Sequence, residues 1–129
     1  MPKRCVCHNE VARLHRFFQE WFAGRLDEDE FGTCELALAP GFVIVTPAGE
    51  LVEREQILTA VRNHRGGEPA GFEIKTVPRS CKRVRGLHLS TYEEHQQGTR
   101  STVRVSTAVI DDEMVWHKVH ETWLTTAEL

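Results

Sequence analysis

The spacing of hydrophobic and polar positions changes once along the chain, near residue 72. Before that point, apolar side chains recur every three or four residues, which is the period of an amphipathic helix. After it, they alternate with polar side chains, which is the period of a β-strand. The pattern therefore predicts an α+β protein in which helices come first and most of the strands come last.

Three N-terminal helices are predicted, with a short hairpin between the second and the third. Asn9 can cap the first helix, and Gly24 can end it. A run of acidic residues favours the start of the second helix, which Pro40 and Gly41 should end. The predicted helices cover residues 10–23, about 27–39 and 53–64, and the hairpin pairs residues 42–46 with 51–52.

Four strands are predicted in the second half of the chain, at residues 72–84, 87–96, 101–110 and 115–124. The segments between them are short enough for two-residue turns, so the strands should form an antiparallel meander. Pro78 cannot donate a backbone hydrogen bond and should therefore lie at a bulge or at an edge of the sheet.

Length and charge limit the classes of function. The 129 residues are expected to form one domain, 1–129, that sustains its own core, with residues 1–8 as a flexible N-terminal tail. The net charge of −3 gives no electrostatic reason to expect a nucleic-acid partner. No run approaches the roughly 18 apolar residues of a membrane span. The N-terminal residues also lack the apolar region of a secretory signal, so a cytoplasmic protein without a membrane partner is expected.

The four cysteines stand at positions 5, 7, 34 and 81. Their spacing fits no disulfide framework, and in a reducing compartment they are expected to be free thiols. Cys5, Cys7 and His8 superficially suggest zinc, but their spacing is tighter than usual and no complementary pair follows. No metal site and no cofactor is therefore expected.

Candidate chemistry lies on the last three predicted strands. If both hairpins have two-residue loops, Arg104 lies between Glu93 and Glu121 on one face of the sheet. An arginine between two carboxylates on an otherwise apolar face would need this pairing in order to be buried. The opposite face then carries Tyr92 beside His120. The period leaves open which face of the sheet meets the helices. A row of this kind is more often a structural network or an oligomer contact than a catalytic site.

Several stretches also carry a resemblance, namely HRFFQEWFAG at 15–24, LAPGFVIVTPAGELVEREQIL at 38–58, TYEEHQ at 91–96 and VHETWL at 119–124. With the order of elements, they resemble a branch of small bacterial proteins of unassigned function in the nuclear transport factor 2-like superfamily, which includes SnoaL-like proteins. The resemblance covers residues 11–124. It implies a cone-shaped α+β roll, in which three helices and a short hairpin pack on a strongly curved, mostly antiparallel sheet and form a conical pocket. It also implies a homodimer through the outer face of the sheet.

Candidate site residues follow from the resemblance and from the strand pattern. The ligand-binding candidates are Trp21, Arg54, Tyr92, Arg104, His117 and Trp123. The resemblance also implies that Glu94 lies in the pocket or at the interface. The catalytic candidates are Glu121, Glu93 and His120. Enzymes that share the resemblance rely on aspartates in the pocket, whereas the aspartates of this chain fall in predicted helix starts and turns. Only a glutamate-based mechanism is therefore open to it.

Three functions remain open on this basis. The preferred hypothesis is a homodimer that binds a small apolar or amphipathic ligand in an apolar pocket with a few charged residues. The first alternative is a cofactor-independent isomerase, dehydratase or hydrolase in which Glu121 or Glu93 is the general base. The second alternative is a structural or association domain without a ligand, since a shared fold does not determine a function.

Overall fold

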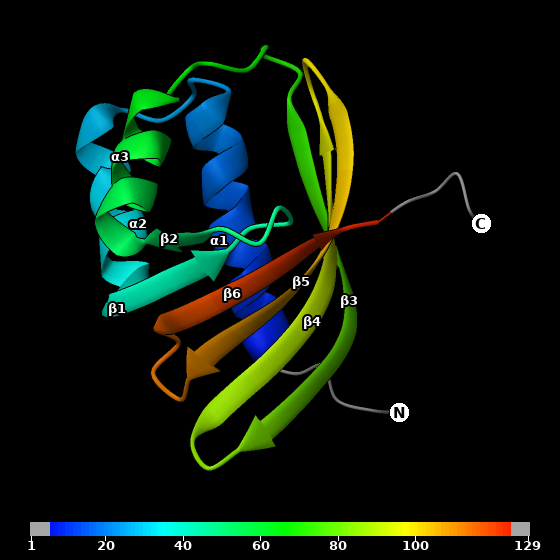
Figure 1. The fold of residues 1–129 in the computed structure, drawn as a ribbon. Helices are drawn as coiled ribbons and strands as arrows, with labels where there is room; N and C mark the ends of the chain where they lie inside the picture. Colours follow the sequence, from blue (N-terminus) through cyan, green and yellow to red (C-terminus); the bar gives the residue numbers. More distant parts are fainter. Residues whose placement is uncertain (1–5, 125–129) are drawn as a thin grey trace.

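The computed structural model describes residues 6–124, in which a curved sheet wraps around the first helix (Figure 1). The α-helices are α1 (Val6–Phe22), α2 (Gly32–Ala37) and α3 (Arg54–Asn63), and a short 3-10 helix, η1 (Glu28–Phe31), precedes α2. The strands are β1 (Leu38–Val45), β2 (Leu51–Glu53), β3 (Glu73–Val84), β4 (Leu87–Gln97), β5 (Ser101–Asp111) and β6 (Trp116–Trp123). The α+β class and the predicted order of elements are confirmed.

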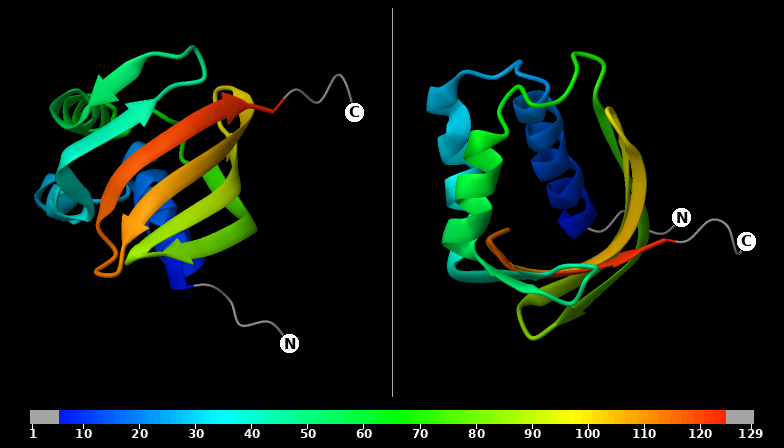
Figure 2. Two further views of the ribbon diagram at one scale, coloured as in Figure 1. Left: turned by 60° about the horizontal axis from the view of Figure 1, so that its bottom comes forward. Right: turned by 45° about the horizontal axis from the view of Figure 1, so that its top comes forward.

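The six strands form one sheet in the order β2-β1-β6-β5-β4-β3. Every neighbouring pair is antiparallel except β1 and β6, which run parallel and join the short hairpin to the meander. The sheet is open, with β2 and β3 at its edges, and its strong curvature is clear in Figure 2. Within residues 6–124, no helix is long and apolar enough to cross a membrane.

The first two helices differ from their predicted bounds. Helix α1 begins at Val6 and not at Glu10, so residues 6–8 of the expected tail are helical, while residues 1–5 lie outside the described part. Helix α2 ends at Ala37, and β1 continues through Pro40 and Gly41. The register of β1 against β6 shifts between Leu38 and Val43. A proline is tolerated in such an irregular stretch, because no regular ladder bond is required of it there.

Two cysteines depart from the expected free thiols. The sulfur atoms of Cys7 and Cys81 lie 2.50 Å apart as a disulfide pair, which links the first turn of α1 to β3. Cys34 is free and buried, and Cys5 lies outside the described residues. Spacing along the sequence did not predict the pair, because its two members are 74 residues apart and meet only through the packing of α1 on β3.

The turns between strands set which residues share a face. The turn between β3 and β4 has two residues, as predicted, because Val84 pairs with Leu87. The next loop has three residues, since β4 and β5 pair at Gln97 and Ser101. This one-residue difference from the predicted register exchanges the two faces of β4 relative to β5. Pro78 lies on the edge strand β3 beside a register shift, which confirms its predicted place.

The hairpin between β5 and β6 differs by two residues from the predicted register, which leaves its faces unchanged. Ser106 stands opposite Glu121, and the register shifts between Val109 and Ile110. Arg104 and Glu121 therefore share the inner face with Glu94, whereas Glu93 lies on the outer face. The predicted row of Glu93, Arg104 and Glu121 is wrong for this reason.

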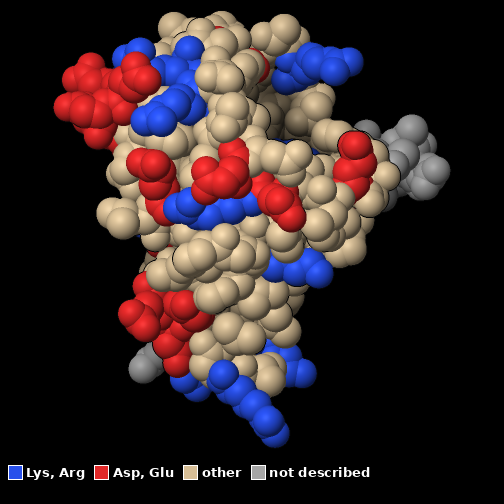
Figure 3. All heavy atoms as spheres, turned by 60° about the vertical axis from the view of Figure 1, so that its left-hand side comes forward, with Lys and Arg blue, Asp and Glu red and all other residues tan. Residues whose placement is uncertain are grey.

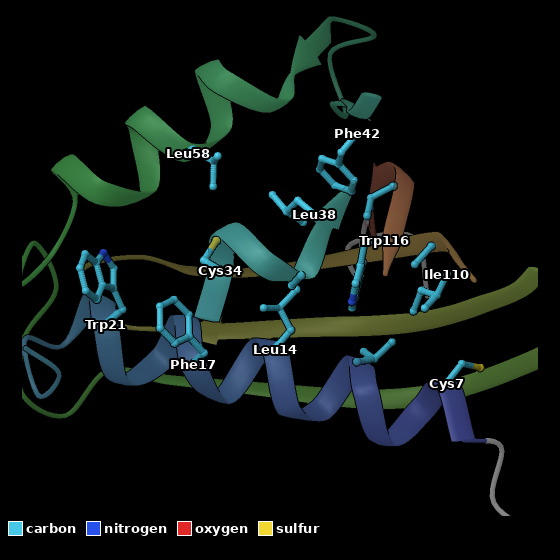
Figure 4. Packing of buried hydrophobic residues seen from close by; sticks show 14 of the residues in the cluster. Cys7, Leu14, Phe17, Trp21, Cys34, Leu38, Phe42, Leu58, Ile110 and Trp116 are labelled. Atoms are coloured by element: carbon cyan, nitrogen blue, oxygen red, sulfur yellow. The ribbon is translucent and has the colours of Figure 1, made fainter. Parts of the chain in front are cut away.

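The core lies between α1 and the concave face of the sheet, with α2 and α3 beside it (Figure 4). Trp21 and Trp116 are among its largest fully buried side chains. The indole nitrogen of Trp21 donates a hydrogen bond to the Val61 carbonyl at 2.7 Å, and that of Trp116 donates to Glu10 at 2.8 Å. Because both polar atoms are satisfied, these rings fix α1 against α3 and against the sheet.

Candidate functional site

A cavity of about 280 Å³ opens between α1, α3, β1 and the inner face of the sheet. Most of its lining is aliphatic or aromatic, and its polar side chains come mainly from β4, β5 and β6. The lining includes Leu14, His15, Phe18, Phe22, Leu38, Phe42, Ile44, Ile57, Ala60, Val61, Ile74, Tyr92, Glu94, Gln96, Arg104, Trp116, Val119 and Glu121. Apolar walls with a few convergent polar groups are the usual composition of a small-molecule site.

Arg104 forms the centre of the polar end of this cavity. Its Nη2 donates to Glu94 at 2.6 Å, and its Nη1 lies 3.3 Å from Oε2 of Glu121. Both carboxylates are buried, at 4% exposure for Glu94 and 8% for Glu121. The two contacts differ in quality, because only the bond to Glu94 is short enough for a strong charge-assisted hydrogen bond.

His15 reaches the same cluster from α1. Its Nδ1 donates to the Val11 carbonyl at 2.8 Å, and its Nε2 lies 3.1 Å from Oε1 of Glu94. The Val11 carbonyl and the ionised Glu94 carboxylate both accept hydrogen bonds, and the charge of His15 lowers the pKa of Glu94. Glu94 thus lies between two cationic side chains, whereas Glu121 contacts only one of them closely.

The two glutamates respond to this environment in opposite directions. Burial raises the pKa of Glu94, but the charges and hydrogen bonds of His15 and Arg104 outweigh it and hold that pKa well below its ordinary value. Burial also raises the pKa of Glu121, and the negative charge of Glu94 raises it further. The charge of Arg104 lowers this pKa but does not offset the two increases. When two carboxyl groups in one site have pKa values shifted in opposite directions, one can stay ionised while the other gains and loses a proton. Here Glu94 suits the first role and Glu121 the second.

Two further groups at this end can donate hydrogen bonds to a ligand. Burial, with the charges of Glu94 and Glu121, raises the pKa of the Tyr92 phenol well above its ordinary value, so it keeps its proton. Arg104 Nε is buried and has no hydrogen-bond partner within residues 6–124. This nitrogen has almost no accessible surface, so the part of Arg104 that a bound molecule can reach is the rest of its guanidinium, whose side chain is 22% exposed.

The structure brings three of the predicted site residues together at the cavity, namely Tyr92, Arg104 and Glu121. Tyr92 belongs to the inner face, and so it does not lie beside His120 as the two-residue loop had predicted. Glu93 is on the outer face, where it pairs with Arg79 at 2.9 Å and with His95 at 2.8 Å.

The other predicted residues lie away from the cavity. His120 is exposed on the outer face, and His117 is bonded to Asp111 at 2.9 Å near the turn between β5 and β6. Trp123 is 55% exposed, with its ring 5.9 Å from the Arg104 guanidinium.

Trp21 and Arg54, also predicted to bind a ligand, do not line the cavity and instead hold other parts of the fold together. Trp21 is fully buried in the core. Arg54 donates to the carbonyls of Leu38 and Glu35, at 3.2 and 2.9 Å, and so ties the start of α3 to the end of α2.

His15 was absent from the predicted site residues, and Glu94 was expected only from the resemblance, as a pocket or interface residue; both belong to the polar cluster of the cavity. A signal for His15 was present, since helical spacing puts it on the same face as Val11, Leu14 and Phe18. A polar residue on the buried face of a helix needs a partner. The signal for Glu94 depended on the length of the loop after β4, which the pattern did not fix.

Comparisons with known proteins identify the fold and give no activity. No family model and no curated protein matches the chain. The structure is similar to that of an NTF-2-like protein of unknown function from Pseudomonas aeruginosa, with a TM-score of 0.84, 24% identity, and coverage of 94% of this chain and 100% of that one. The nuclear transport factor 2-like fold implied by the sequence is therefore confirmed.

Two more distant structures carry provisional functional assignments. One, from Shewanella frigidimarina, is provisionally assigned as a ketosteroid isomerase, with a TM-score of 0.60, 15% identity, and coverage of 92% of this chain and 95% of that one. The other, from Exiguobacterium sibiricum, is provisionally assigned as a Ca/calmodulin-dependent kinase II association domain, with a TM-score of 0.57, 13% identity, and coverage of 97% and 98%. At these identities the likeness concerns the fold alone.

Proposed function

On the premise of this nuclear transport factor 2-like fold, we propose that the protein binds a small, largely apolar molecule whose one polar group lies beside Arg104 and Glu121. The observation that carries the proposal is the cavity of about 280 Å³, with apolar walls and a charged cluster at one end. Its volume is near the lower end of the range of roughly 300–1,000 Å³ for small-molecule sites. A ligand of one or two rings suits this space better than a larger one.

The groups at the polar end favour a ligand with a hydrogen-bond acceptor such as a carbonyl oxygen. The Arg104 guanidinium and the Tyr92 hydroxyl are the donors on this side. Glu121 can donate a hydrogen bond when protonated and accept one when ionised. It therefore suits a hydroxyl or an acidic C–H group on the ligand, next to the carbonyl. Burial of an apolar ring supplies most of the binding free energy, and the polar contacts set the orientation.

A ligand-free association domain is less well supported, because side chains of the described residues leave the cavity unfilled. Substitutions on neighbouring residues of α3 test the cavity directly. Both residues are exposed, but Ala60 lines the cavity and Thr59 does not. A tryptophan at position 60 adds an indole at the cavity wall, and a tryptophan at position 59 adds the same group to solvent.

The test is binding of prodan, a neutral naphthalene ketone that fluoresces at shorter wavelength in an apolar site. We expect the wild type to bind the dye with blue-shifted emission, and Ala60→Trp to weaken binding by roughly tenfold or more, equivalent to about 1.4 kcal/mol. Thr59→Trp should bind as the wild type does. Equal binding by Ala60→Trp and the wild type would place the dye elsewhere and contradict the proposal.

A second candidate function is acid–base catalysis on such a ligand, with Glu121 as the general base. It is favoured by the raised pKa of Glu121, because a base works best when its pKa lies near the working pH. The provisional assignment of a structural neighbour as a ketosteroid isomerase agrees with this class of reaction. The Arg104 guanidinium and the Tyr92 hydroxyl would then stabilise negative charge on the ligand oxygen.

We also propose that two copies associate through the outer face of the sheet. A shallow groove on that face is formed by Val105, Thr107, Val109, Lys118, His120 and Thr122, and no helix covers it (Figure 2). Around α2 and α3, by contrast, acidic and basic side chains are interspersed (Figure 3). The provisional association domain among the structural neighbours supports a role of this fold in assembly.

Light scattering during size-exclusion chromatography tests this association. The wild type should elute with twice the chain mass of 14.8 kDa. Val105→Arg should shift it to the monomer, because an unpaired charge at the centre of an interface is costly. Thr59→Arg, on α3, should remain a dimer. A wild type that is monomeric at every concentration tested would refute the proposal.

A further inference from the structure

A second group of chemically active side chains lies where the first turn of α1 meets β3. It consists of Cys7, His8 and Cys81, and a ring nitrogen of His8 and the two sulfur atoms all lie within 4.8 Å of one another. Cys7 is fully buried and stands at the beginning of the helix in Figure 4, whereas Cys81 is partly exposed. The cavity described above does not include any of the three.

We propose that this group, when its cysteines are reduced, is a binding site for Zn²⁺ with two thiolates and one imidazole as protein ligands. Thiolate and imidazole are the ligands that Zn²⁺ prefers, and two cysteines with one histidine supply three of the four ligands of a tetrahedral site. The ligands come from residues adjacent in sequence on α1 and from a strand 74 residues away, so the metal would hold the same two elements together as the disulfide does.

The orientation of His8 agrees with metal binding. Its Nε2 lies 3.0 Å from the Ser80 carbonyl and donates to it, so Nδ1 is the ring nitrogen that would bind the metal. A histidine that ligates a metal usually donates its other ring N–H to a carboxylate or a backbone carbonyl, and this bond fixes the tautomer. The carbonyl belongs to the residue before Cys81, so the same segment of β3 would orient one ligand and supply another.

Ser90 is a second buried group at this place. It stands opposite Cys81 on the neighbouring strand β4, and it is fully buried. Its hydroxyl has no hydrogen-bond partner within residues 6–124. A hydroxyl can rotate to donate to a thiolate sulfur, and such donation is typical of the groups that surround zinc-bound cysteines.

The site has two chemical states that exchange by a balanced reaction. A dithiol reductant transfers two electrons and two protons to the disulfide, which gives two thiols and the oxidised, cyclic disulfide of the reductant. Zn²⁺ then binds both sulfurs as thiolates and releases the two thiol protons to water. The disulfide and the metal therefore exclude one another, and oxidation would release the metal.

Cobalt is the probe for this site, because tetrahedral Co²⁺ with thiolate ligands has charge-transfer bands in the near ultraviolet and strong visible bands. The reduced full chain, freed of reductant under anaerobic conditions, is titrated with CoCl₂ and then with ZnCl₂. We expect one Co²⁺ per chain with a thiolate spectrum, and loss of that spectrum as Zn²⁺ replaces it. The oxidised chain should give no such spectrum.

Three variants distinguish this site from adventitious binding. Cys81→Ser should weaken Co²⁺ binding by at least about a hundredfold, since removal of an outer partner alone costs about 10–100-fold. His8→Gln keeps both sulfurs and should also weaken binding. Cys34→Ser should bind as the wild type does, because burial raises the pKa of the Cys34 thiol to about 12 and keeps it protonated.

Circular dichroism of each variant shows whether it is folded, and His8→Gln remains a test if Cys81→Ser does not fold. No thiolate-to-cobalt absorption from the reduced wild type would overturn the proposal. So would unchanged affinity in His8→Gln, which would show that the two sulfurs bind the metal without the imidazole.

Discussion

Replacing Arg104 with methionine should lower the free energy of unfolding by about 3–5 kcal/mol, the usual cost of removing one partner of a buried ion pair. Methionine retains much of the apolar volume of the arginine, so the loss is mainly electrostatic. Glu94 would remain 4% exposed with His15 as its only close cationic partner, and Glu121 would lose its own. Urea unfolding at neutral pH measures the effect.

The matched control is Arg79→Met, because Arg79 pairs with Glu93, the sequence neighbour of Glu94, on the outer face. That pair is exposed, and its loss should cost only about 0–1 kcal/mol. The predicted two-residue loop would instead have placed Glu93 beside Arg104 on the inner face, and Arg79 would then have had a buried partner. A larger loss in Arg79→Met than in Arg104→Met would therefore contradict the register on which the site depends.

Acid should reduce the deficit of Arg104→Met. In the wild type the pKa of Glu94 is lowered, so its contribution to stability is present above its ordinary pKa and is lost as the pH falls through the lower value of the folded state. Arg104→Met removes one of the charges that lower the pKa of Glu94, so this pKa rises relative to the wild type and protonation removes the buried charge at a higher pH. The difference in unfolding free energy should be smaller at pH 4 than at pH 7.

Glu121→Gln should have the opposite dependence on pH and should remove any proton transfer. The pKa of Glu121 is raised, so the folded state gains most from its protonated form, and this gain is lost as the pH rises through the pKa of the folded state. Glutamine does not ionise. The melting temperature of Glu121→Gln relative to the wild type should therefore be higher at pH 8 than at pH 4.

The same variant separates binding from catalysis. If Glu121 is a general base, its replacement should lower turnover of a substrate by about 10²–10⁴-fold while the ligand still binds. Glu93→Gln is the control, because it makes the same chemical change on the outer face. An unchanged rate in Glu121→Gln would exclude this glutamate as the base and leave binding as the function of the cavity.

Much of the fold was predictable because local signals agreed with one another. Helical and strand periods located the three helices and the meander, and Arg85 and Gly86 both have the positive φ angles of a tight two-residue hairpin turn. Pro78 lies on an edge strand beside a bulge, as predicted, because proline has no backbone N–H to donate to a neighbouring strand. Between β3 and β4, the turn residues and the hydrophobic pattern agree, and together they set the strand register.

The site was harder to predict because its key strand carries a weak pattern. The end of β4 reads Glu93, Glu94, His95, Gln96 and Gln97, so apolar alternation does not show which side is buried. The register of a strand is weakly specified where both of its faces are polar. One extra residue in the loop after β4 therefore placed Glu94, and not Glu93, on the inner face. The pairing of α1 with β3, which unites Cys7 with Cys81, also lies beyond any local pattern.

An NMR titration of the side-chain carboxyl carbons of Glu94, Glu121 and Glu93 is the most direct test of the central claim, that the cavity ends in two glutamates with opposite tendencies to ionise. The structure predicts that Glu121 titrates above the ordinary glutamate pKa of 4.5 and that Glu94 titrates well below it. Glu93 is the reference for the outer face. Its hydrogen bonds with His95 and Arg79 lower its pKa below the ordinary value. A pKa of Glu121 at or below the ordinary value, or a pKa of Glu94 above it, would contradict the account.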